Sequence, residues 1–389
     1  MKFADKLAGA LYGIAIGDGM GAPVEGWASP PIMERFGDHD FTTFIPPTHT
    51  IDPAKGKGAG RITDDTLMTE ALMEAYAEAR SHLDAYGYAD YLLPLVKDCP
   101  RWIPEWQKES PLWDRLWFAE QYPWFRLVSS NAEPRTAGVG NKVNCGVAMW
   151  MMPVGAVNAG APLDAYQEAV LLGSAHNESF AIEAGAVMAA ASAEVLSASG
   201  TIDSLLDVVS SLAKDGTQRA IRAVIEASDP QDSLASFILK TRAAVAPYDQ
   251  RTGHCPDDAP LSLPEFSNVG RPSRVSSIEE LPVAFAALRY GQGDALKTLK
   301  ASVCYGRDCD SIASMAMGLF GGLYGVDALP STLCTHVDQA NRRNFGEISS
   351  VFLPVIQGIL ANDRKDLDHR ERSICAEQDA SAVADKPRR

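Results

Sequence analysis

The sequence is poor in the features that mark several large classes of protein. Its seven cysteines form no Cys-x-x-Cys pair and cannot all be paired, which argues against a disulfide-stabilised secreted domain. The longest apolar run, residues 145–157, is too short to cross a membrane and contains Pro153. Lys and Arg number 35 against 50 Asp and Glu, and the net charge of −15 argues against sequence-independent binding of nucleic acid. We therefore expect a soluble cytoplasmic protein that binds neither membrane nor nucleic acid.

Runs of alternating β-branched residues, which would predict strands, are also missing, and apolar residues recur at three- and four-residue spacings. Hydrophobic residues make up 46% of the 389, which is enough for a large core. The spacing therefore predicts a mainly α fold. Helices are expected over residues 3–16, 162–175, 179–198 and 278–300, from residue 312 onward, and twice within 202–245. Loops are expected over residues 17–25 and 246–275, and the second, with His254 and Cys255, could form the rim of a functional site.

Two acidic segments each precede an apolar helical pattern. They are Thr63-Asp64-Asp65-Thr66 and Asp308-Cys-Asp310-Ser311. A helix N-terminus stabilises negative charge by only about 0.3–1 kcal/mol per group, which is too little to hold several carboxylates together. Divalent cations could hold them, because hard cations prefer oxygen ligands. For the first segment alone, a helix cap at Thr63 is the competing interpretation.

Other residues have both a functional and a structural interpretation. Glu25 follows a glycine-rich segment that can pass close to a ligand, or it is a solvated loop carboxylate. His176 lies at a helix junction, where a structural histidine is common. Residues 136–160 lead from a Gly/Asn loop into a helix and could present backbone N–H groups to a phosphate or carboxylate. The aromatic-rich residues 86–135 predict buried helix faces, with a stacking wall for a flat ligand as the alternative.

Several motifs occur together in a fixed order along the chain. They are Gly17-Asp-Gly-Met-Gly-Ala-Pro-Val-Glu25, Thr63-Asp-Asp-Thr66, Cys145-Gly-Val-Ala-Met149, His176 and Gly306-Arg-Asp-Cys-Asp-Ser-Ile-Ala313. This set resembles the ADP-ribosylglycohydrolase family, the relatives of dinitrogenase reductase-activating glycohydrolase, over nearly the whole chain. The resemblance implies an all-α, orthogonal multi-helix bundle that forms one domain over residues 1–361. Residues 362–389 are charged and weakly apolar, and we expect them to be a disordered tail.

The resemblance also assigns roles to individual residues. It implies a binuclear centre of two divalent cations, Mg²⁺ or Mn²⁺, with ligands at Thr63, Asp64, Asp65, Asp308, Asp310 and Ser311. Catalytic roles fall to Glu25, Asp65 and Asp308. Substrate contacts fall to Asn144, Cys145, Gly146, His176 and Gly306. Trp150 stands where the family usually has Arg.

These matches imply a hydrolase that cleaves the glycosidic bond of an ADP-ribosyl or related ribosyl group with metal-activated water. Its partner would be an ADP-ribosylated protein or a small ribosyl-containing molecule. Two alternatives stay open. One is a hydrolase of a small N-riboside or nucleotide-like substrate, and the other is a catalytically silent binding or structural protein on the same fold.

Overall fold

The computed structural model of the protein describes residues 1–248 and 277–384, with side chains described as far as Ile374. His254 and Cys255, in the expected loop, lie outside the described residues. The helices and strands are α1 (Phe3–Gly21), α2 (Ser29–Phe36), α3 (Asp64–Ala79), α4 (Ala85–Gly87), α5 (Leu93–Asp98), β1 (Pro100–Ile103), β2 (Lys108–Pro111), α6 (Phe118–Ser129), α7 (Met152–Val157), α8 (Pro162–Gly173), α9 (Ser179–Leu196), α10 (Ile202–Leu212), α11 (Asp215–Ala227), α12 (Leu234–Val245), α13 (Ser277–Gly291), α14 (Ala295–Tyr305), α15 (Cys309–Tyr324), α16 (Ser331–Asn341) and α17 (Phe345–Ala384). The mainly helical fold expected from the sequence is thereby confirmed.

A glycine stripe lets α1 and α15 pack backbone against backbone. Gly9, Gly13, Gly17 and Gly21 recur every four residues and so lie on one face of α1. A Cβ atom at Gly13 would lie 2.0 Å from a carbonyl oxygen of α15, and one at Gly17 would lie 2.2 Å from another. No side chain larger than hydrogen fits at these contacts. The stripe therefore fixes how the two helices lie against each other.

The first helix is longer than its sequence predicts. We expected it to end at residue 16 because glycine in a helix interior costs about 1 kcal/mol relative to alanine. Instead α1 continues to Gly21, and a 3₁₀ turn over Ala22–Val24 follows it. The close packing on α15 outweighs the low helix propensity of the glycines. The extra turn carries Asp18 into the protein interior.

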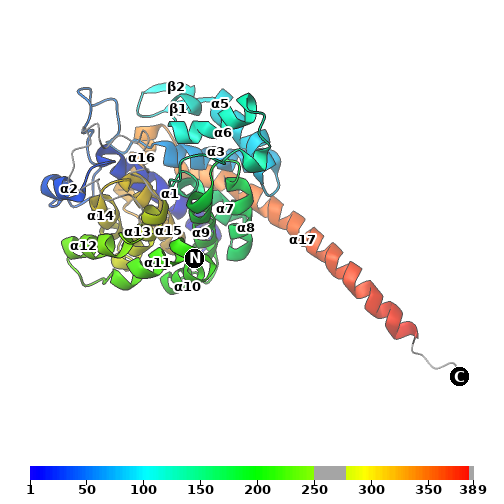
Figure 1. Cartoon of the computed structure of the whole chain (residues 1–389). Helices are drawn as coiled ribbons and strands as arrows, with labels where there is room; N and C mark the ends of the chain where they lie inside the picture. The colour runs from blue at the N-terminus through cyan, green and yellow to red at the C-terminus, as the bar shows by residue number, and fades with distance from the viewer. Residues whose placement is uncertain (249–276, 385–389) are drawn as a thin grey trace.

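Buried helices surround the α1–α15 pair (Figure 1). All but the last residue of α15 are buried, and the alanine-rich α9 and the helices α13 and α14 pack around it. By length and composition, α9 and residues 345–374 of α17 could each cross a membrane, but α9 is 72% buried as a core helix. The described chain thus has one continuous core built on α1 and α15.

The C-terminal part, which we expect to be a disordered tail, begins as a helix. Residues 362–384 continue α17 as a helix that extends away from the body of the protein (Figure 1). Its described side chains beyond Asp363 are exposed, so tertiary packing does not hold it. Opposite charges four residues apart, Asp366 with Arg370 and Asp368 with Arg372, favour a helix in water.

The aromatic-rich segment is only partly buried and is not all helical. Strands β1 and β2 form an antiparallel hairpin in which Trp102 pairs with Glu109. Trp117, Phe118 and Phe125 are exposed, so the expected buried helix faces are wrong at these positions. The segment instead forms a covering layer, in which the rings of Trp113 and Trp124 meet edge to face.

Candidate active site

Carboxylates from three helices meet at one end of the α1–α15 pair. Asp18 lies on α1, Asp65 lies in the first turn of α3, and Asp310 lies in the first turn of α15. Their carboxylate oxygens lie within 4.8 Å of one another. Glu25, Asp308 and Asp310 form a second group of the same kind. Asp310 belongs to both groups, so the early and late acidic segments form one continuous cluster.

Asp18 is the member of the cluster that sequence reasoning missed. It accepts hydrogen bonds from the backbone N–H and the hydroxyl of Thr63, both at 2.8 Å, and from the backbone N–H and the hydroxyl of Thr66 at 3.2 and 2.5 Å. Thr63 makes no capping bond of its own, so Asp18 caps α3 from a neighbouring helix. The sequence signal that could have revealed Asp18 is a carboxylate between the glycines at the end of α1. Thr63, expected as a ligand, is fully buried against Asp18.

Burial and crowding disfavour the ionised form of four carboxylates in the cluster. Burial is the largest cause, and it raises the pKa of Asp18 and of Asp308 to about 6. Burial and neighbouring carboxylates also raise the pKa of Asp65 and of Asp310 well above the usual value. Among the described residues, no Lys or Arg pairs with Asp18, Asp65 or Asp308. An all-oxygen set that lacks compensating charge fits divalent cations, which would reverse these shifts.

Two cations stand beside the cluster, and each neutralises one carboxylate at its edge. Arg115 pairs with Asp64 at 2.7 Å and with Glu105 at 2.9 Å, while Lys57 pairs with Glu25. Burial alone would raise the pKa of Asp64, but Arg115 and Lys57 bring it below the usual value. Asp64, expected as a metal ligand, is therefore an ion-pair partner of Arg115 and belongs to neither three-carboxylate group. The sequence analysis identified neither cation.

The acidic cluster opens into a cavity of about 540 Å³. Of the residues expected to bind metal or substrate or to catalyse, most line this cavity. They are Glu25, Asp64, Asp65, Asn144, Cys145, Gly146, Asp308, Asp310 and Ser311. The chain thus brings together segments that are up to 286 positions apart, from Glu25 to Ser311.

The loop at residues 144–146 forms one wall of the cavity and is held by its own side chains. Asn144 accepts hydrogen bonds from the backbone N–H of Gly146 at 3.2 Å and from the side-chain amide of Asn177 at 3.1 Å. The Cys145 thiol donates to Asp308 at 3.0 Å. Because the Gly146 N–H already has a partner, it is not free to bind a phosphate, and the residues of the loop line the cavity.

Two expected substrate contacts lie away from the cavity. His176 is fully buried, with Nδ1 3.0 Å from the Tyr88 hydroxyl and its ring against that of Trp150. Burial lowers the pKa of His176 to about 3, so the ring is neutral and structural. Gly306 has φ +83° and lies against the backbone of Trp27, where it turns the chain into α15. The fully buried Trp150 likewise belongs to the core, and no cation replaces the family arginine at this position.

The aromatic-rich layer also contributes residues to the lining of the cavity. Trp106 from the β1–β2 turn and Trp117 from the start of α6 line it. For these two rings, the alternative of a stacking wall for a flat ligand stays a prediction. Glu120 from α6 also lines the cavity and is only 4% exposed, and its Oε2 atom has no partner among the described residues. Burial raises its pKa to about 8, so Glu120 is largely protonated at neutral pH.

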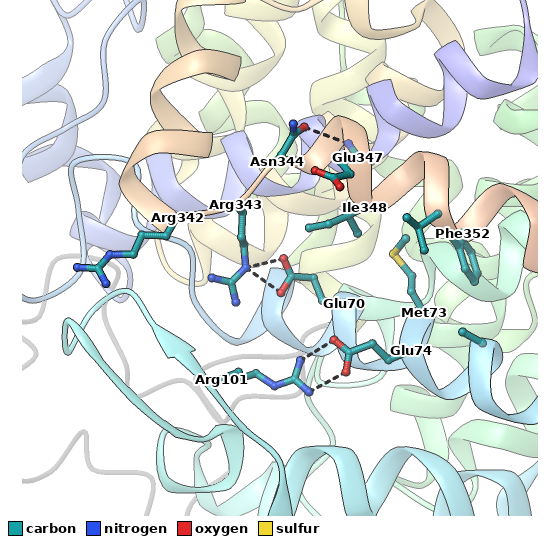
Figure 2. A pocket seen from close by; sticks show the side chains of 12 residues that line it. Glu70, Met73, Glu74, Arg101, Arg342, Arg343, Asn344, Glu347, Ile348 and Phe352 are labelled. Carbon is teal, nitrogen blue, oxygen red and sulfur yellow. Dashed lines mark hydrogen bonds and ion pairs between the residues drawn. The ribbon is translucent and has the colours of Figure 1, made fainter.

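A second cavity, of about 520 Å³, lies between α3 and the start of α17 (Figure 2). It also contains three acidic residues, and two of them are paired with arginines. Arg343 holds Glu70 at 2.7 Å and Arg101 holds Glu74 at 3.1 Å, as the dashed lines in Figure 2 show. Within this second cavity the paired carboxylates leave no all-oxygen group for a metal ion. Of these two cavities, the first is the one lined by members of the carboxylate groups that could hold a metal ion.

The chain is similar to known proteins over nearly its whole length. The sequence profile of the ADP-ribosylglycohydrolase family matches residues 1–362. The uncharacterized protein YegU of Escherichia coli (strain K12) is 24% identical over 348 residues, which cover 89% of this chain and 96% of that protein. A solved structure described as an ADP-ribosylglycohydrolase-related protein complex superposes with a TM-score of 0.57 at 19% identity, over 92% of this chain and 99% of that one. The structural likeness shows a shared fold.

Proposed function

Because the chain belongs to the ADP-ribosylglycohydrolase family, we propose that it is a metal-dependent glycosidase that cleaves an ADP-ribosyl or related ribosyl group from its acceptor. The observation that carries the proposal is the pair of overlapping carboxylate groups joined by Asp310 at the cavity wall. Family membership supports glycohydrolase activity in general. The metal dependence and the bond that is cleaved are our own proposals.

The donor set suits two hard divalent cations, Mg²⁺ or Mn²⁺. One would be held by Asp18, Asp65 and Asp310, and the other by Glu25, Asp308 and Asp310. When bound, such cations bind sugar hydroxyls and lower the pKa of a coordinated water. The Ser311 hydroxyl lies on the same wall and could add an oxygen ligand.

The protein's own residues then orient the reacting groups. Ser314 donates to Asp65 at 2.7 Å, and the Cys145 thiol donates to Asp308, so both carboxylates are fixed in place. Glu25 is partly exposed at the cavity wall, where it can take a proton from water or return one to the leaving group. Negative charge from these carboxylates stabilises the positive charge that develops on the sugar during glycosidic cleavage.

We propose an ADP-ribosylated protein or a small ribosyl-containing molecule as the substrate. Trp106 and Trp117 offer flat faces for a base or sugar, and Asn144 offers amide contacts. The buried Trp150 leaves no cation at the position of the family arginine, which favours a small N-riboside as the second candidate. Five described cysteines, all free thiols, support a reducing cytosol as the site of action.

The substitution Asp308→Asn tests the proposal. It removes a charge that both the metal ions and the sugar would need, while it keeps the shape of a residue whose pKa is already raised. We expect turnover to fall by about a thousandfold or more, with the far-ultraviolet circular dichroism spectrum unchanged.

Hydrolysis is measured with Mg²⁺ and with Mn²⁺ on ADP-ribosyl-arginine, ADP-ribosyl-serine, O-acetyl-ADP-ribose and simple ribosides. Equal turnover by wild type and variant would contradict catalysis at this site. No turnover of any substrate by the metal-loaded wild type would favour a catalytically silent binding protein.

A further inference from the structure

Lys57 places a positive charge inside the cluster that we propose as a metal centre. Its ammonium group pairs with Glu25 and lies 3.9 Å from Asp310 Oδ2. Both carboxylates belong to the group formed by Glu25, Asp308 and Asp310. A lysine ammonium and a divalent cation therefore compete for the same oxygens.

The loop that carries Lys57 is built to hold it there. The Arg61 guanidinium donates to backbone carbonyls of residues 53, 55 and 56 at 2.7 to 3.2 Å. Gly56 and Gly58, on either side of Lys57, have φ of +80° and +127°, which other residues rarely adopt. The backbone is thus fixed, while the Lys57 side chain keeps 32% exposure. It can leave the cluster by rotating its side chain, without any movement of the loop.

The two carboxylate groups differ in whether a lysine lies against them. Among the described residues, no lysine or arginine pairs with Asp18 or Asp65, and Lys57 stands on the side of Glu25. A cation at the first group meets no paired ammonium or guanidinium group on Asp18 or Asp65 among the described residues. A cation at the second group must displace an ammonium ion from Glu25 and Asp310. Two positive charges this close repel each other strongly, so Lys57 and the second cation exclude one another.

We propose that Lys57 is a built-in competitor for one of the two metal positions, so that the centre fills in order. The first ion enters between Asp18, Asp65 and Asp310. The second enters between Glu25, Asp308 and Asp310 only when Lys57 leaves. This inference rests on the proposed metal centre and adds regulation to it: the fully loaded state forms only when the divalent ion is abundant.

Calorimetric titration of Mn²⁺ into the chelator-treated protein, with electron paramagnetic resonance of the bound ions, tests the order of filling. The wild type should bind two ions with separate affinities, and only the second should produce the spin coupling of a Mn²⁺ pair. Lys57→Met keeps the length of the side chain and removes its charge, so the second affinity should rise by about tenfold or more. The first affinity should change by less than about twofold. Lys55→Met is the matched control, because Lys55 lies in the same loop and is exposed.

The outcomes separate this inference from the proposed function. Two Mn²⁺ ions of equal affinity in the wild type, or an unchanged second affinity in Lys57→Met, would overturn the ordered filling and leave the metal centre standing. The absence of any Mn²⁺ binding would overturn both. If Lys57→Met fails to fold, Lys57→Gln removes the same charge with a polar side chain and decides the question. Both measurements are independent of enzymatic turnover.

Discussion

At the scale of single residues, the site is defined by which carboxylates have a cation of their own. Asp64 has Arg115, and Glu25 has Lys57, which also lies 3.9 Å from Asp310, whereas Asp18, Asp65 and Asp308 have no cation among the described residues. Asp64 lies in neither three-carboxylate group, and its neighbour Asp65 lies in one. The adjacent acids Asp64 and Asp65 therefore stand in two different electrostatic environments.

Glu120 allows a test of how burial of a single carboxylic acid changes the stability of the protein with pH. Its pKa in the folded protein is about 8, above the usual 4.5, because burial favours the neutral acid. Folding therefore becomes less favourable as the pH rises from about 4.5 to 8, as the unfolded chain ionises and the folded one does not. Glu120→Gln mimics the neutral form, so it should unfold at a higher temperature than wild type at pH 8, with the difference vanishing near pH 4.5.

Thermal unfolding of the metal-free protein across this pH range checks the expectation. Glu34→Gln is the matched control, because Glu34 is an exposed glutamate on α2. A Glu120→Gln difference that stays constant with pH would show that Glu120 is ionised in the folded protein.

The site residues divide into those that sequence could reveal and those that it could not. Asp308, Asp310 and Asp65 stand in compact motifs, and the structure places all three at the cavity. Lys57 and Arg115 stand in no motif, and their partners lie 32 and 51 positions away. Long-range pairing of this kind has no local signature, so only the fold reveals it.

At the scale of elements, the packing of α1 on α15 positions the cluster. The apolar periodicity predicts most of the helices. It places the end of α1 too early, because glycine has a low helix propensity. The partner that makes glycine favourable, α15, lies about 300 residues away. The charged end of α17 shows the converse case, in which local charge pairs favour a helix that lacks a core contact.

Gly17→Ala tests the role of this packing. The added methyl group would lie 2.2 Å from the carbonyl oxygen of Ala313, so the two helices must separate. We expect a loss of about 2–4 kcal/mol in the free energy of unfolding, measured by chemical denaturation. Mn²⁺ affinity should fall as well, because Asp18 and Asp310 move apart.

Gly358→Ala is the matched control for this change. Gly358 lies within α17 with nothing within 4 Å of the added atom, so alanine should raise stability by about 0.5–1 kcal/mol. Equal effects of the two substitutions would contradict the packing role of the stripe.

At the scale of the whole molecule, the charge of −15 and the acidic cluster pose one problem. The ADP-ribosyl substrate that we propose carries phosphates and would have to approach a negative protein and a negative cavity, which electrostatics disfavours. Bound divalent cations would solve it, because they add positive charge where the carboxylates converge. We therefore expect the protein to need bound divalent cations for binding an anionic substrate as well as for cleaving it.

Asp310 offers the most direct test, because it is the one residue shared by both carboxylate groups. The measurement is the Mn²⁺ stoichiometry of the wild type and of Asp310→Asn by calorimetry, with thermal unfolding as the check on folding. We expect two ions in the wild type, and in the variant a loss of about a hundredfold or more in affinity at both positions. An Asp310→Asn protein that binds two ions as tightly as wild type, or a folded wild type that binds none, would contradict the account.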